Sequence, residues 1–153
     1  MSRIEIIDYQ AKYAADFYKL NVEWLERYFY VEPHDKEVLE NPQLYIINNN
    51  GYIFFAKLNT KIVGTVALIN ESECYELSKM AVSPEYRGQR IGEQLMNHCI
   101  RFSKEQGWKK IMLYSNKMLT PAINLYKKAG FKEVMLEKDI WYERANIKMI
   151  LEL

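Results

Sequence analysis

The sequence has few of the residues that build disulfide frameworks and metal sites. Among its 153 residues there are two cysteines and two histidines. Cys74 and Cys99 show no CxxC spacing and no histidine-rich surroundings, which argues against a disulfide scaffold or a zinc site. We therefore expect two reduced thiols, a cytoplasmic protein and no bound metal.

Long apolar runs and a large excess of one charge are missing as well. The longest apolar stretches, such as Ile62–Ile69, have the length of a strand, so we expect no membrane span. The first ten residues carry charges and lack the apolar centre of a signal peptide. The formal net charge is +1 and no basic run occurs, which argues against a nucleic-acid-binding surface.

Local patterns predict one α/β domain over residues 1–153, because no repeat or flexible linker interrupts the chain. Alternating or β-rich stretches predict strands at 3–9, 51–59, 62–70, 74–82, 109–116, 131–137 and 145–153. Three- and four-residue spacings and end signals predict helices at 12–28, within 31–43, from about 90 to Gly107, and at 120–130 with Thr120 as its cap. The strand–helix–strand unit at 75–115 indicates two parallel strands in a mixed sheet.

The stretch SPEYRGQRIGEQL (Ser83–Leu95) has the composition of an anion site at the start of a helix. A helix start exposes unpaired backbone N–H groups and partial positive charge. Gly88 and Gly92 allow close backbone approach, and Arg87 and Arg90 add charge. An ordinary strand-to-helix turn with two solvated arginines explains the same residues. Neither a Walker loop nor a dinucleotide-binding fingerprint explains these residues. The GxxxxGK[ST] motif of the first is absent, and two of the three glycines of the second are missing.

Two motifs in sequence order resemble those of a known family. ELSKMAVSPEYRGQRIGEQL (Glu76–Leu95) resembles the central motif of the GNAT superfamily of acyl-CoA-dependent N-acyltransferases, an L/M-x-V strand and a proline turn before [Q/R]-x-x-G-x-[G/A]. Arg90 replaces the middle glycine. AINLYKKAGF (Ala122–Phe131) resembles the next motif, A-x-x-L-Y-x-x-x-G-F, at every named position. The resemblance implies a mixed, mostly antiparallel sheet with a splayed central parallel strand pair and about four flanking helices.

The same resemblance implies acetyl-CoA, or a close acyl-CoA, as co-substrate. The pantetheine arm would pair with a strand that a bulge splays from its neighbour, and the pyrophosphate would bind the backbone of the loop and helix start. The residues implied for this role are Met80, Ala81, Val82, Arg87, Gly88, Gln89, Arg90, Ile91, Gly92, Glu93, Asn116 and Tyr126.

Two of these positions depart from the family pattern. Many relatives have an asparagine seven residues before the motif tyrosine, where this chain has Leu119. Asn116 could replace it at the pantetheine, or it could cap the turn. By register, Arg90 falls at or next to the first helical turn, where we expect an ordinary residue to be tolerated.

The resemblance implies an N-acetyltransferase in which a primary amine attacks the thioester directly in a ternary complex. Tyr126, in the motif, would be the acid that protonates the leaving thiolate; a core tyrosine on a helical stripe is the alternative. Glu76 would be the base that takes the amine proton, directly or through water. A solvated strand carboxylate, or an ion pair with Lys79, is its alternative.

The acceptor cannot be identified from these residues, although its surroundings can be predicted. Trp24, Tyr28, Glu76 and Tyr142 are our candidates for substrate binding, and His34 lies in a loop expected to border the site. A set of acidic residues would suit a cationic amine: Glu23, Glu26, Glu32 and Asp35. A core stripe backed by a solvated face explains most of these residues equally well.

Two further possibilities follow from the same residues. The chain could be an acyl-CoA-binding sensor without turnover, because the sequence shows no unambiguous catalytic base. The last strand, Ala145–Leu153, could form a sheet edge that pairs across a homodimer interface.

Overall fold

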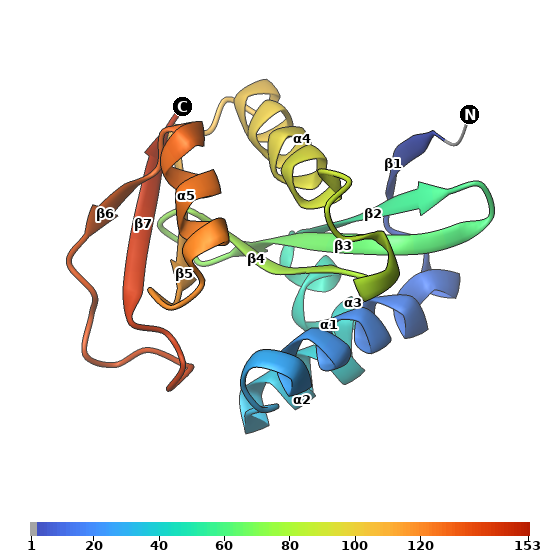
Figure 1. The fold of residues 1–153 in the computed structure, drawn as a ribbon. Helices are drawn as coiled ribbons and strands as arrows, with labels where there is room; N and C mark the ends of the chain where they lie inside the picture. The colour runs from blue at the N-terminus through green and yellow to red at the C-terminus, as the bar shows by residue number, and fades with distance from the viewer. Residues whose placement is uncertain (1–2) are drawn as a thin grey trace.

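A computed structural model describes residues 3–153 as one seven-stranded sheet covered by helices on both faces (Figure 1). The strand order is β1-β2-β3-β4-β5-β7-β6, and only β4 and β5 run parallel among these neighbours. The bounds are β1 Ile4–Asp8, β2 Tyr52–Leu58, β3 Lys61–Asn70, β4 Tyr75–Val82, β5 Lys110–Ser115, β6 Lys132–Val134 and β7 Ile147–Glu152. The mixed sheet with a central parallel pair is confirmed.

Five α-helices pack on the sheet as two layers. On one face lie α1 (Ala14–Tyr28), α2 (Pro33–Glu40) and α3 (Pro42–Tyr45), and on the other lie α4 (Ile91–Glu105) and α5 (Thr120–Ala129) (Figure 1). Each layer has its own core because each long helix places its apolar residues at three- and four-residue steps. Phe17, Leu25 and Phe55 belong to the first core, and Leu95 and Met149 to the second.

The sheet opens between its two parallel strands. The register between β3 and β4 shifts at Val66, where the extra residue of a bulge lies on β4, and Lys79 in this bulge has a φ of 56°. The parallel pairing of β4 with β5 stops at Glu76 and Met112. From Leu77 onward, the edge of β4 that faces β5 has no strand partner among the residues described. The expected bulge and splayed pair are therefore confirmed.

Three expectations about single elements are wrong. The last strand, β7, lies between β5 and β6, so it is not an edge strand and cannot pair with a strand of another copy. Thr120 does not cap α5 but is its first residue, after Leu119. His34 is not in a loop, because the cap formed by Glu32 and Asp35 starts α2 just before it.

None of the helices in residues 3–153 combines the length and the apolar character that crossing a bilayer requires.

Candidate functional site

The last residues of the loop before α4 and the first residues of α4 form a helix start. Gly88 has a φ of +83°, a conformation that glycine adopts without strain. Ile91, Gly92 and Glu93 form the first turn of α4, where N–H groups have no partner inside the helix. These residues make the anion-binding geometry that the sequence indicates.

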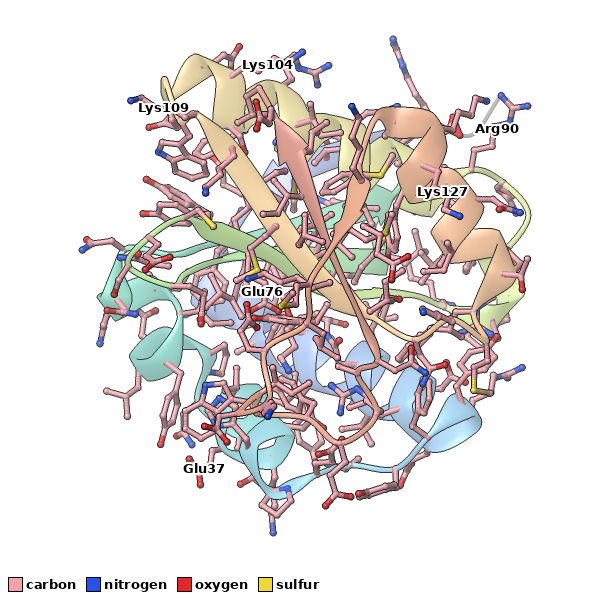
Figure 2. The ribbon with its side chains drawn as sticks, turned by 90° about the vertical axis from the view of Figure 1, so that its left-hand side faces the viewer. Glu37, Glu76, Arg90, Lys104, Lys109 and Lys127 are labelled. Atoms are coloured by element: carbon pink, nitrogen blue, oxygen red, sulfur yellow. The ribbon has the colours of Figure 1, made fainter. Side chains whose placement is uncertain are left out.

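Arg90 is not in the ordinary helical conformation expected for it. It caps α4 with φ 61° and ψ 25°, the left-handed region. An L-residue in this region costs about 1 kcal/mol because Cβ approaches the following carbonyl. The glycine that the family motif has at this position would adopt this conformation without strain, whereas Arg90 adopts it under strain. Its side chain lies at the periphery and points outward (Figure 2).

Arg87, the other arginine of the loop, is held by α1. Its guanidinium donates to Glu23 at 3.2 Å and lies 5.8 Å from the ring centre of Tyr28. Tyr28, predicted to bind substrate, is 39% exposed and contacts Trp24 on the outer side of α1. Tyr28 therefore lies beside the loop, whereas Trp24 lines the opening in the sheet.

A cavity of about 110 Å³ occupies that opening, and we call it the split cavity. Its walls are Trp24 of α1, Leu77–Met80 of β4 and Tyr126 of α5. Burial raises the pKa of Tyr126 to about 12, so its hydroxyl stays protonated at neutral pH. Ala81 and Val82 continue β4 from this cavity toward the loop before α4. The predicted acid and the predicted pantetheine strand therefore lie at one opening.

Glu76, the predicted base, lines a second cavity of about 140 Å³. We call it the acidic cavity; its lining is Glu71, Glu76, Tyr114, Asp139, Ile140, Trp141, Tyr142 and Ala145. Figure 2 shows Glu76 in the middle of the molecule, near the segment that connects β6 to β7. Tyr142, predicted for substrate binding, comes to the same cavity, but Tyr126 lines the other one.

The environment of Glu76 favours its protonated form. Its side chain is buried, and burial followed by the charge of Glu71 raises its pKa from 4.5 to about 7. The charges of Lys79 and Arg144 act in the opposite direction and are weaker. Ser78, two residues further along β4 than Glu76, lines the split cavity together with Tyr126.

An ion cluster that the sequence did not reveal holds the cavities' walls together. The Arg144 guanidinium donates to both oxygens of Asp35 at 2.6 and 2.8 Å and to Glu32 at 3.1 Å. Lys79 donates to Asp35 at 3.0 Å and to the hydroxyl of Tyr142 at 2.7 Å. The cluster thus joins α2, the β4 bulge and the segment before β7. The alternative of a Glu76–Lys79 ion pair is wrong, since the ammonium group lies on Asp35.

The cluster also corrects the expected charge of the acceptor site. Glu32 and Asp35 are buried and paired, and Glu23 pairs with Arg27 and Arg87. Burial alone would raise the pKa of Asp35, but hydrogen bonds from Arg144 and the charge of Lys79 hold it below its usual value. These carboxylates are therefore not free to attract an amine.

Asn116 is engaged inside the protein through both ends of its side chain. Its amide donates to the Arg144 carbonyl at 2.7 Å, and its carbonyl accepts from the Met118 N–H at 2.9 Å. This arrangement favours the turn-capping alternative over a contact with pantetheine. Leu119, at the position of the family's asparagine, lines the split cavity.

In residues 3–153, no three His, Cys, Asp or Glu side chains come together in a group that could hold a metal ion.

Comparison with known proteins identifies the family. The model of the "Acetyltransferase (GNAT) family" matches residues 15–131. A "Probable N-acetyltransferase camello" of Xenopus tropicalis is 29% identical over 105 residues, covering 67% of this chain and 48% of that protein. A "Putative [ribosomal protein bS18]-alanine N-acetyltransferase" of Bacillus subtilis (strain 168) is 25% identical over 151 residues, covering 97% of this chain and 89% of that protein. The chain thus spans about half the length of the first relative and most of the second.

Solved structures share the fold over nearly the whole chain. A GNAT-family acetyltransferase of Staphylococcus aureus Mu50 aligns with a TM-score of 0.85 and 25% identity, covering 98% of this chain and 99% of that one. PaiA N-acetyltransferase from Thermoplasma acidophilum, solved with coenzyme A, aligns with a TM-score of 0.78 and 18% identity, covering 99% of each chain. An Elizabethkingia anophelis GNAT-family acetyltransferase, solved with acetyl-CoA, gives 0.74 and 23%, covering 98% of each. The family match, the paired motifs and this fold together show that the chain belongs to the GNAT acetyltransferase family.

Proposed function

We propose that this chain, as a single domain, is an N-acetyltransferase that moves an acetyl group from acetyl-CoA to a primary amine by direct attack in a ternary complex. The observation that carries the proposal is the opening between β4 and β5, with Tyr126 at one cavity and Glu76 at the next. The two groups are connected through β4, because Ser78, which borders the cavity of Tyr126, lies two residues after Glu76.

The residues around the opening fit acetyl-CoA. Backbone N–H groups from Gly88 to Glu93 would bind the pyrophosphate, since they start α4 and add the partial positive charge of its dipole. The pantetheine arm would lie along Met80, Ala81 and Val82, on the edge of β4 that β5 leaves unpaired. A Cβ at Gly92 would lie 3.6 Å from the Met80 sulfur, an ordinary van der Waals contact, so the start of α4 lies close to β4.

Two proton transfers are assigned to the chain's own groups. Acetyl-CoA supplies an activated carbonyl carbon, to which the amine nitrogen bonds as the C–S bond breaks. Glu76, with a pKa of about 7, would take the proton that the amine loses, through Ser78 or water. Tyr126, with a pKa of about 12, would give its proton to the departing thiolate. The products are the amide and coenzyme A, and the two side chains then exchange protons with solvent.

The Tyr126→Phe variant tests this assignment. Phenylalanine keeps the ring that packs against Phe131, so the variant should fold and bind CoA as the wild type does. Loss of the acid should lower kcat by about 10²-fold or more, with less effect on KM for acetyl-CoA. Released CoA thiol measures kcat, and calorimetric titration with CoA measures binding.

Different results separate the possible errors. An unchanged kcat would remove Tyr126 from the acid role. Tight CoA binding by the wild type without thiol release for any amine would instead indicate the acyl-CoA-binding sensor.

A further inference from the structure

The acidic cavity is lined by acidic side chains that form no ion pair among the residues described. Glu71 lies at its mouth on the turn before β4, Glu76 at its base, and Asp139 on the segment before β7. Three acidic side chains therefore surround a space of about 140 Å³.

Three cations close to this cavity are paired with other carboxylates. Lys79 and Arg144 are bound to Asp35, and Lys148 is bound to Glu137. Among residues 3–153, no ion pair reaches Glu71, Glu76 or Asp139. A cationic ligand in this cavity would therefore not have to compete with an internal ion pair.

Glu76 is the group in this cavity that most needs a cation. It is 9% exposed, it lines the cavity, and it lacks an ionic partner within the part of the chain described. A buried carboxylate without such a partner is costly to the fold and is kept where it has a ligand or a proton to handle. The carboxylate thus indicates a positively charged ligand by an observation independent of its acidic neighbours.

Aromatic rings form another wall of the cavity. Trp141 and Tyr142 line it, and the Trp141 ring stacks on His34 with centroids 4.0 Å apart. This stacking fixes a ring that is otherwise 69% exposed. A fixed aromatic face attracts alkylammonium groups and packs against their methylene chains.

We propose that the acidic cavity binds the acceptor as an aliphatic diamine. One amino group would lie at Glu76, next to Ser78 and the split cavity, and would be the one acetylated. The second, still charged, would lie between Glu71 and Asp139 at the mouth. The inference rests on the proposed function for the transfer itself, but the binding it describes can be measured without turnover.

Size and charge favour a short diamine over a peptide amine. Cavities of about 150 Å³ hold six-heavy-atom ligands such as benzene, and 1,4-diaminobutane also has six heavy atoms. The α-amine of a peptide carries a carbonyl oxygen close to the nitrogen, and this oxygen would gain no partner among three carboxylates. A monoamine of the same length would leave the mouth carboxylates without their cation.

Calorimetric titration of the whole chain with 1,4-diaminobutane, n-butylamine and a peptide with N-terminal alanine tests the inference. We expect the diamine to bind about tenfold more tightly than n-butylamine, as for an added charged hydrogen bond. In Glu71→Gln this preference for the diamine over n-butylamine should fall severalfold. Glu71 is exposed and unpaired in the part of the chain described, so the variant should fold; Glu105→Gln, an equal charge change on α4, should leave the preference intact.

Three results would overturn it: equal affinity for the two amines, a preference that survives in both Glu71→Gln and Asp139→Asn, or tighter binding of the peptide than of the diamine. Failure of the proposed function would look different. It would appear as absent CoA binding or absent thiol release, which the amine titrations do not measure.

Discussion

Replacing Glu76 by glutamine should stabilise the protein in a way that depends on pH. The carboxyl has a pKa of 4.5 in an ordinary setting and about 7 in the fold. Each pKa unit corresponds to about 1.4 kcal/mol, so the charged form costs the fold about 3 kcal/mol at pH 8. Because the folded-state pKa is raised, this cost is absent at low pH, grows between pH 4.5 and 7, and is complete above 7.

Glutamine has the shape of the protonated acid and cannot ionise, so it removes the cost. We therefore expect Glu76→Gln to be more stable than the wild type by about 3 kcal/mol at pH 8 and by less than about 1 kcal/mol at pH 5. Urea unfolding at the two pH values, followed by the fluorescence of the three tryptophans, measures the difference.

Glu105→Gln, an exposed carboxyl on α4, is the control and should change little at either pH. A stability difference between Glu76→Gln and the wild type that is the same at pH 5 and pH 8 would contradict the raised pKa. A wild type that is more stable than the variant at pH 8 would contradict it as well, because Glu76 would then be a partnered carboxylate. The same variant should no longer transfer acetyl groups, because it lacks the base. A variant that is more stable but inactive would show that Glu76 lowers the stability of the fold and is needed for catalysis.

Two further predictions concern the loop before α4 and the ion cluster. Arg90→Gly should raise the free energy of unfolding by about 1 kcal/mol, or the Tm by about 2–4 °C, because glycine adopts the left-handed φ without strain. CoA binding should be unchanged or modestly weaker. Scanning calorimetry measures the Tm, and an unchanged or lower Tm would contradict the strain at Arg90. Arg144→Ala should lower the free energy of unfolding by about 3–5 kcal/mol, because it leaves Glu32 and Asp35 buried without that cation. Arg27→Ala removes an exposed ion pair and should lower it by less than about 0.5 kcal/mol. Equal losses of stability in urea unfolding would show that burial of the ion pair does not determine its contribution.

Local patterns were sufficient for the elements that carry the cofactor-binding segments. The stripe of α4 and the alternation of the strands depend on residues a few positions apart, so their periods are visible in the sequence. The glycine ends are equally local: Gly107 and Gly130 have φ values of +78° and +108°, as expected after a helix.

The ion cluster could not be predicted, because its partners are far apart in sequence. Lys79 and Asp35 are separated by 44 residues, and Arg144 and Asp35 by 109. A charge carries no local sign of whether it will be buried with a partner or solvated. Asp35 therefore suggested a substrate-attracting surface, although its position three residues after Glu32 fits a helix cap.

The conformation of Arg90 was missed for a related reason. Register along the chain places it beside the first turn, but register does not give the sign of φ. The family motif contained the missing signal, since a glycine required at one position often marks a positive φ.

Amine-dependent release of CoA thiol from acetyl-CoA tests the central claim most directly. The chain would be mixed with acetyl-CoA and a panel of short monoamines, diamines and peptides, and the thiol compared with that released without amine. We predict release above this background for at least one amine, with one acetylated product formed per thiol. Binding of acetyl-CoA with no amine-dependent release across the panel would contradict the assignment as an acetyltransferase.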